Sequence, residues 1–259
     1  MEIPLFPLHQ VLCPGIVLPL HIFEDRYQAM TRHCLDTGQP FGVVLIRDGR
    51  EVGTKGIATL AGVGAFAEIR EAGRYPDGRY DVLAAATGRF AIESVDAQRE
   101  PYLIADVTPL DDEVGDEDRA DRLAKRAIRR FVKYLDLMRA REGESSEVLD
   151  IRVELEATVG EPDPEADPMA TAETELSIEG AATTRADLDI PDDPTILSYL
   201  LSGIVQVELP RRQALLEART TVERLEGLVA LLEREVLLLG RRLRYFSPDP
   251  ATIGGARRS

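Results

Sequence analysis

The spacing of hydrophobic residues changes once along this chain, near residue 115, and no other feature constrains the fold as much. Residues 2–110 contain short, β-branched apolar runs separated by Gly, Pro and Asp, which is typical of strands. From residue 117 onward the apolar residues recur at helical spacing. The sequence therefore predicts an α+β protein, with a β-rich subdomain at 1–115 and a helical bundle at 116–259.

One turn in the β-rich half has a clear physical basis. Pro76 presets φ, Asp77 can hydrogen-bond its own backbone, and Gly78 tolerates positive φ. We expect a hairpin that joins residues 64–72 to residues 79–86 in antiparallel pairing. Several short strands with a single early helix favour a compact, partly closed β-barrel over an alternating β-α sheet.

The early helix is predicted from apolar residues at i, i+4, i+7 and i+11, which are Phe23, Tyr27, Met30 and Cys34. Phe23 and Tyr27 are therefore expected to face the core, and Gly38 is expected to end the helix. The chain has two cysteines, Cys13 and Cys34, too few for a disulfide framework. Both are interpreted as buried thiols.

Two helices are predicted first in the second half. One begins near residue 117, where acidic residues suit the helix dipole, and the other begins at Asp193, an N-cap that Pro194 follows. The apolar face expected for the first helix consists of Leu123, Ala127, Ile128, Phe131, Leu135 and Met138. The face expected for the second consists of Ile196, Leu197, Leu200, Leu201, Ile204 and Val205.

Two more helices are predicted to follow. Pro210 is expected to open a helix over 211–218, and a capping box of Thr220 and Glu223 is expected to start the last one. The last helix has apolar residues at steps of three and four: Val222, Leu225, Val229, Leu232, Val236, Leu239, Leu243 and Phe246. Further leucines, at 216, 228, 231, 237 and 238, favour packing within a bundle. A homodimer through the helix at 221–246 is the alternative.

The acidic charge of the chain is concentrated in one insert. The formal net charge is −15, and residues 142–190 hold 15 Asp and Glu against two Arg. This composition predicts a flexible linker at roughly residues 160–187, and a partner-binding loop or pseudo-substrate tail is the alternative. The acidic balance opposes binding to a phosphate backbone, so nucleic acid is an unlikely partner.

No apolar run approaches the roughly 18 residues that would span a bilayer, and the start of the chain has no basic signal region. We expect a soluble, cytoplasmic protein without a membrane partner.

Several segments in order resemble the N-terminal, substrate-binding domain of Lon proteases. They are IPLFPLHQVLCPGIVLPLHIFEDRYQAM at 3–30, FGVVLI at 41–46, DGRYD at 77–81, GRFAI at 88–92, PYLIADVTPLDDE at 101–113 and the helical stretch at 193–235. The resemblance implies a PUA-like β-barrel followed by an α-helical bundle. It also implies a set of signature residues with structural or binding roles, which are Pro14, Gly15, His21, Phe23, Glu24, Arg26 and Tyr27.

The chain contains no G-x-x-x-x-G-K-[ST] motif for ATP, and we expect no catalytic residues, no metal and no cofactor. A zinc set of His9, Cys13, His33 and Cys34 is disfavoured because adjacent helical residues diverge by about 100°. The motif Gly62-x-Gly64-x-x-Ala67 is disfavoured as a dinucleotide site because strand follows it. His21 is interpreted as a hydrogen-bonding residue, and Glu24 with Arg26 as an ion pair at the helix start.

The resemblance implies a non-catalytic module that binds unfolded or hydrophobic polypeptide segments reversibly, or acts as an adaptor for a separate protease or chaperone. We expect binding in a groove between the barrel and the bundle. RNA or small-molecule recognition is the second hypothesis. It would need a basic stripe in the folded barrel, made by Arg47, Arg50, Lys55, Arg70, Arg74 and Arg79. A third hypothesis, a cryptic hydrolase, would need a catalytic cluster in a deep pocket.

Overall fold

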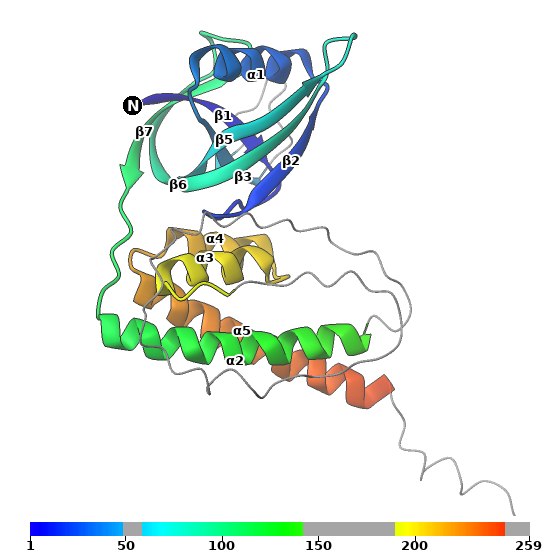
Figure 1. Cartoon of the computed structure of the whole chain (residues 1–259), viewed down its shortest axis with the longest axis vertical. Helices are drawn as coiled ribbons and strands as arrows, with labels where there is room; N and C mark the ends of the chain where they lie inside the picture. Colours follow the sequence, from blue (N-terminus) through cyan, green and yellow to red (C-terminus); the bar gives the residue numbers. More distant parts are fainter. Residues whose placement is uncertain (49–58, 142–189, 247–259) are drawn as a thin grey trace, which may run out of the picture. The chain divides into compact units, whose positions relative to one another are not determined.

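A computed structural model describes residues 1–48, 59–141 and 190–246 of the chain (Figure 1). The strands are β1 (Glu2–Leu8), β2 (Val17–Ile22), β3 (Phe41–Asp48), β4 (Thr59–Leu60), β5 (Val63–Arg74), β6 (Tyr80–Asp96) and β7 (Leu103–Leu110). The helices are α1 (Asp25–Thr37), α2 (Glu117–Arg141), α3 (Pro194–Ile204), α4 (Leu209–Glu217) and α5 (Thr221–Phe246). The linker predicted at 160–187 lies outside the described residues.

The sheet curls so that its first strand pairs on both sides. The strand order is β1-β7-β6-β5-β3-β4, and β2 pairs with β6 beside this path. Strand β1 is antiparallel to β7 and parallel to β3. These pairings give the barrel-like β subdomain that the sequence predicts, and the α+β fold class is confirmed.

The predicted hairpin is the longest pairing in the sheet, between β5 and β6. Its turn closes with a hydrogen bond from the Tyr75 N–H to the Arg79 carbonyl at 2.9 Å and one from the Gly78 N–H to the Tyr75 carbonyl at 3.0 Å. Gly78 has φ 94°, as the last residue of a three-residue hairpin loop requires. The interpretation of Pro76, Asp77 and Gly78 is confirmed.

Glycine on β5 lets the strands pack closely around a buried phenylalanine. A Cβ on Gly64 would lie 2.5 Å from the Phe90 ring and 2.6 Å from the Val43 carbonyl oxygen. Gly64 lies within β5 and pairs with Phe90. The second glycine of the dinucleotide-like motif therefore lies in a strand, and strand follows the motif as the sequence indicates.

Helix α1 begins two residues later than the predicted stripe, and this changes the place of Phe23. Tyr27, Met30 and Cys34 are buried, and Gly38 ends the helix in the left-handed region with its N–H bonded to the Cys34 carbonyl. Phe23 is 63% exposed. The prediction that Phe23 faces the core is wrong, because the residue lies in extended chain before the N-cap and does not follow the helical period.

The predicted helix starts are largely confirmed. The Asp193 carboxylate accepts hydrogen bonds from the Thr195 and Ile196 N–H groups at 2.7 and 2.9 Å. Helix α4 begins at Leu209, two residues before the predicted start. Half of the capping box forms. Thr220 Oγ1 accepts a hydrogen bond from the Glu223 N–H at 3.1 Å, but the Glu223 carboxylate accepts from the N–H of Arg219 and not from that of Thr220.

Helices α2 and α5 run in the same direction and pack along most of their length, with ion pairs from Arg126 and Arg130 to Glu233 at 2.7 and 3.2 Å. The seam of α5 is buried against its neighbours most completely at Leu225 and Leu232, and the further leucine Leu228 is fully buried as well. Bundle packing is therefore confirmed for the described part of the seam. Three residues predicted to be apolar contacts are exposed: Ile196, Leu237 and Leu238.

A polar cluster with two buried arginines joins the sheet to the helices. It consists of Arg89 on β6, Asp112 after β7, Tyr199 on α3 and Arg224 on α5, and we call it the junction network. Asp112 Oδ1 accepts from Arg89 at 2.8 Å and from the Tyr199 hydroxyl, and Arg224 stacks 3.7 Å from the centroid of the Tyr199 ring. Arg89 also donates to the carbonyls of Leu216 and Ala218 at the end of α4. Burial lowers the pKa of Arg224.

The predicted division of the chain into two subdomains at residue 115 stays a prediction.

Candidate functional site

Two signature residues, Pro14 and Gly15, form a structural corner. The Ile16 N–H donates to the Cys13 carbonyl at 3.1 Å, and Gly15 has φ 81°, which gives a tight turn with Pro and Gly at its centre. Helix α3 lies directly against this turn, because a Cβ on Gly203 would be 2.6 Å from the Ile16 side chain. These two residues therefore set how α3 packs on the barrel.

Three more signature residues fix the start of α1. Arg26 Nε donates to Glu24 Oε2 at 2.8 Å, and the Arg26 guanidinium lies 4.4 Å from the centroid of the Tyr27 ring. The Tyr27 ring is buried with its centroid 4.3 Å from that of Phe6 on β1. The geometry is that of a helix-start ion pair over a core aromatic residue.

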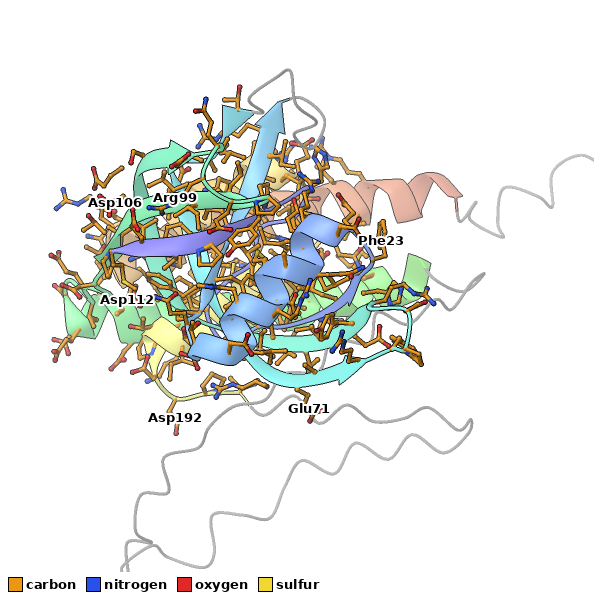
Figure 2. All side chains as sticks on the ribbon, turned by 90° about the horizontal axis from the view of Figure 1, so that it is seen from above. Phe23, Glu71, Arg99, Asp106, Asp112 and Asp192 are labelled. Atoms are coloured by element: carbon orange, nitrogen blue, oxygen red, sulfur yellow. The ribbon has the colours of Figure 1, made fainter. Side chains whose placement is uncertain are left out.

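The remaining two, His21 and Phe23, lie on the surface with Tyr75 and Asp81, and we call these four residues the aromatic patch. His21 Nδ1 donates to Asp81 Oδ1 at 2.6 Å, and the Tyr75 hydroxyl donates to Asp81 Oδ2 at 2.5 Å. The His21 ring stacks on the Phe23 ring with centroids 6.3 Å apart, and the Tyr75 ring lies 6.2 Å from His21. Phe23 lies beside the start of α1 (Figure 2) and is 63% exposed, and Tyr75 is 41% exposed.

Charge in the aromatic patch is fixed on one carboxylate. The hydrogen bonds from His21 and Tyr75 lower the pKa of Asp81 below its ordinary value of 3.8. The hydrogen bond between the Tyr75 hydroxyl and Asp81 raises the pKa of Tyr75. Asp81 is thus an acceptor and both partners are donors at neutral pH. The network holds the rings of His21 and Tyr75 in place on Asp81.

A shallow cavity of about 680 Å³ adjoins the aromatic patch on the outer face of β2, β6 and β5. Gly73 lies in its wall, and a Cβ there would meet nothing closer than 4.0 Å, so internal packing does not require a glycine. A strand glycine of this kind leaves room for another backbone to approach. The full lining is Pro19, Leu20, His21, Glu71, Ala72, Gly73, Asp81, Val82 and Leu83.

The edge of β2 beside this cavity is open among the described strands, since β2 pairs only with β6. Pro19 in this strand lacks an N–H and limits, but does not abolish, the pairing capacity of the edge. The site therefore combines exposed aromatic rings, an apolar shallow surface and backbone groups that can accept another extended chain.

The sequence missed Tyr75 and Asp81. Asp81 ends the DGRYD motif that the sequence singled out, and the register pairs it with His21 across β2 and β6. Tyr75 is the residue before the predicted turn. Only the strand register brings them together, and no local spacing in the sequence encodes that register.

A cavity also exists between the sheet and a helix, where the sequence analysis expects a groove. It measures about 470 Å³ and lies between β3 and α4, beside an ion pair of Arg47 with Glu217 at 2.5 Å. Gln213 bridges the two sides through a hydrogen bond to the Val63 carbonyl at 3.0 Å. No exposed aromatic residue lines it, so the aromatic patch is the better candidate.

Of the side chains considered for metal binding, those of Cys13, Cys34 and His33 are buried or hydrogen-bonded elsewhere. Cys13 and Cys34 are buried, and burial raises the pKa of each thiol to about 11. His33 bonds to the side chain of Gln39 at 3.2 Å. Within the described ranges no three His, Cys, Asp or Glu side chains are grouped to hold a metal ion.

The proposed basic stripe is largely neutralised where it is described. Arg47 pairs with Glu217, Arg70 lies 3.7 Å from Glu68 and Arg79 lies 2.7 Å from Asp77. Arg74 stacks near the Tyr80 ring. Two members of the stripe, Arg50 and Lys55, lie outside the described residues.

Comparison with known proteins gives a consistent family match. The family described as "ATP-dependent protease La (LON) substrate-binding domain" matches residues 2–234. A Lon protease of Brevibacillus choshinensis is 23% identical over 93% of this chain and 26% of its own length. A Lon protease of Escherichia coli K12 is 24% identical over 92% of this chain and 25% of its own length. The chain thus spans about a quarter of the length of these curated relatives.

Two solved structures share the fold. The Lon N-terminal domain protein from Xanthomonas campestris has a TM-score of 0.53 at 21% identity, covering 89% of this chain and 98% of that one. The N-terminal domain of Mycobacterium avium complex Lon protease has a TM-score of 0.55 at 16% identity, covering 90% and 98%. Among the described helices, none has the length and apolarity needed to cross a membrane.

Proposed function

The chain belongs to the family of LON substrate-binding domains. From this premise we propose that it is a non-catalytic module, and that it binds unfolded or hydrophobic polypeptide segments at the aromatic patch. The observation that carries the proposal is the exposure of Phe23 and Tyr75 beside His21, which itself lines the shallow cavity on β2, β5 and β6. Large exposed aromatic side chains dominate the energetics of protein recognition.

Binding would use two kinds of contact. Apolar side chains of a bound segment pack on Phe23, Tyr75 and Leu83, while its backbone hydrogen-bonds to the open edge of β2. Main-chain hydrogen bonds give affinity for any extended chain, and the aromatic rings favour hydrophobic side chains. This combination suits a module that must recognise many unfolded sequences.

The test is a fluorescence anisotropy titration of the full chain with a labelled, permanently unfolded protein at physiological salt. We expect saturable binding that Phe23→Ala weakens about tenfold, because truncating a central aromatic contact typically has an effect of this size. The matched control is Leu35→Ala, since Leu35 is an exposed apolar residue on α1, 44% accessible, outside the patch. Equal affinity of Phe23→Ala and the unmodified chain would refute the assignment to the patch.

RNA recognition is the second candidate, and the formal net charge of −15 counts against it. A single-stranded RNA titrated under the same conditions should give no response. RNA binding that weakens steeply with salt, without affinity for polypeptide, would overturn the proposal, because such a salt dependence reports release of counterions from phosphates.

We further propose that the protein acts in the cytoplasm, as an adaptor beside a separate protease or chaperone. Adding the chain to an ATP-dependent protease and a labelled unfolded substrate should speed degradation, and Phe23→Ala should remove the increase. Unchanged degradation would leave the polypeptide-binding module without an adaptor role.

A further inference from the structure

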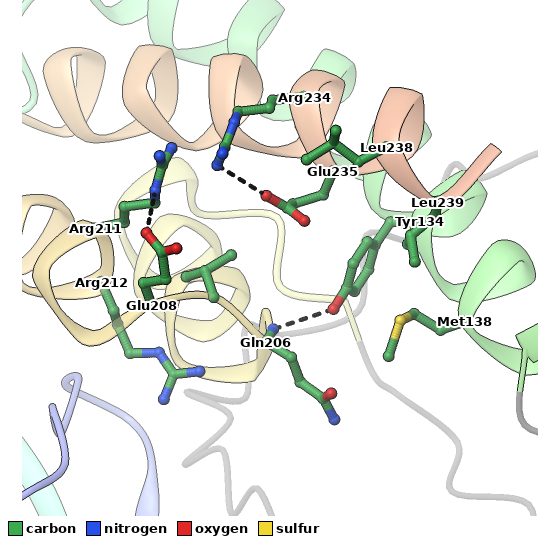
Figure 3. A pocket seen from close by; sticks show the side chains of 11 residues that line it. Tyr134, Met138, Gln206, Glu208, Arg211, Arg212, Arg234, Glu235, Leu238 and Leu239 are labelled. Carbon is green, nitrogen blue, oxygen red and sulfur yellow. Dashed lines mark hydrogen bonds and ion pairs between the residues drawn. The ribbon is translucent and has the colours of Figure 1, made fainter. Parts of the chain in front are cut away.

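The helical half carries a second surface that none of the aromatic-patch residues touches. A groove of about 590 Å³ lies between the later part of α2, the turn after α3, the start of α4 and the later part of α5 (Figure 3). Tyr134, Met138 and Leu239 supply apolar lining. The Tyr134 hydroxyl accepts a hydrogen bond from the Gln206 N–H at 3.2 Å, which holds the turn against α2.

The rim of the groove carries three arginines, from α4 and α5. Arg211 and Arg212 lie in the first turn of α4, which contains no acidic residue. Positive charge in this position is unfavourable to the helix dipole. Arg234 lines the opposite wall on α5. Three guanidinium groups therefore face two carboxylates, Glu208 and Glu235, in a chain whose formal net charge is −15.

The carboxylates present hold these arginines weakly. Arg211 pairs with Glu208 at 3.0 Å and Arg234 with Glu235 at 3.2 Å, and each pair joins near neighbours on one partly exposed stretch (Figure 3). Exposed pairs of this kind contribute little to stability, because water screens them and both long side chains lose freedom. Arg212 donates to the Val205 carbonyl, and its buried Nε has no hydrogen-bond partner in the described part of the chain. Carboxylates from another molecule can replace or supplement these contacts.

Exposed leucines adjoin the charged rim. Leu238 lines the groove and is 39% exposed, and its neighbour Leu237 is 53% exposed. Leucines left in water beside arginines form a surface with an apolar centre and a cationic border, which complements an amphipathic segment with acidic flanks.

We propose that this groove is a docking site for an acidic, amphipathic segment of a partner protein, with leucine-like anchors against Met138 and Leu238 and carboxylates on Arg211 and Arg234. The site is separate from the aromatic patch and does not depend on the function proposed for that patch. A chain with both surfaces can hold a polypeptide at one and a partner protein at the other.

The probe is a labelled helical peptide of about 14 residues, with Leu at helical spacing and Glu elsewhere. Its binding to the full chain is followed by anisotropy, and the same peptide with Lys in place of Glu is the control. We expect binding of the acidic peptide alone. The double variant Arg211→Glu/Arg234→Glu should weaken it about tenfold or more. Leu238→Ser should also weaken it, while Val132→Ser, at a similarly exposed residue of α2, should not.

The charge control is Arg119→Glu, which is compared with each single reversal, Arg211→Glu and Arg234→Glu. Arg119 is exposed on α2 and pairs with Glu226, outside the groove, so its reversal changes the net charge without changing the site. An equal loss of affinity in Arg119→Glu would reduce the effect to non-specific attraction and overturn the proposal. A concentration-dependent dimer in sedimentation that Leu238→Ser dissociates would assign the groove to a second copy of the chain and overturn it as well. Phe23→Ala should leave the peptide affinity unchanged, which separates this site from the aromatic patch.

Discussion

At the scale of single residues, Asp81 holds the aromatic patch together, and its titration is measurable. Its pKa lies below 3.8 because His21 and Tyr75 donate hydrogen bonds to the carboxylate. A lowered folded-state pKa means that Asp81 stabilises the fold above pH 3.8 and that this contribution is lost as pH falls through the lowered pKa. The patch should therefore keep its geometry throughout the neutral range.

We expect Tyr75→Phe to raise the pKa of Asp81 toward 3.8, because the variant loses one of the two donors. Carboxyl-carbon NMR titration measures this change. Asp77 serves as the internal reference, since its lowered pKa comes from the backbone N–H and side chain of Arg79 and not from Tyr75. An Asp81 titration midpoint that stays in place in Tyr75→Phe would show that the hydroxyl does not stabilise the carboxylate.

Residue-scale prediction from sequence succeeds where the cause is local. Pro76, Asp77 and Gly78 make a turn by their own backbone preferences, and the sequence was sufficient to predict it. Phe23 shows the limit. Its spacing fits the stripe of α1, but the helix starts at Asp25, so the ring is exposed. A helix boundary shifted by two residues was enough to move this aromatic side chain from the expected core to the candidate site.

At the scale of elements, replacing two helical glycines by alanine should change the stability of the fold in opposite directions. A Cβ on Gly203 would lie 2.6 and 2.8 Å from two atoms of Ile16, so Gly203→Ala should push α3 away from the Pro14–Gly15 corner. We expect a net loss of about 1–2 kcal/mol, since overpacking outweighs the gain in helix propensity. A Cβ on Gly240 would meet nothing within 4 Å, so Gly240→Ala should gain about 0.5–1 kcal/mol. Urea denaturation followed by far-UV circular dichroism measures both, and a stabilised Gly203→Ala would contradict the close packing of α3 on the corner.

Element prediction depends on whether the signal lies within the element. The Asp193 cap and the seam of α5 can be recognised because one segment contains the whole pattern. The pairing of β1 with β3 and the pairing of β2 with β6 join strands separated by other elements. The register of β2 on β6 places His21 opposite Asp81, which is why sequence reasoning alone proposed His21 as a site residue without its partner.

At the scale of the whole molecule, the junction network explains how sheet and helices are held in one arrangement. Arg89 and Arg224 are buried, and their charges are offset by Asp112 and by the terminal carbonyls of α4. The negative end of the α4 dipole adds to that compensation. The sequence does not reveal this network, because its members come from four elements or loops, and no local spacing in the sequence shows that they meet.

We expect Asp112→Ala to destabilise the protein by about 2–3 kcal/mol, because the two buried guanidinium groups of Arg89 and Arg224 lose their shared carboxylate. The partial exposure of Asp112 keeps the loss from being larger. The control is Asp111→Ala, since the Asp111 backbone carbonyl, and not its side chain, accepts from Arg89, so its effect should stay within about 0.5 kcal/mol. If the network couples the two halves, unfolding of Asp112→Ala should also lose cooperativity, so that near-UV and far-UV circular dichroism report separate transitions. Equal stability of the two variants, with coincident transitions in both, would mean that apolar packing of Tyr199, Leu200 and Leu216 on the barrel core is enough to hold the helices in place.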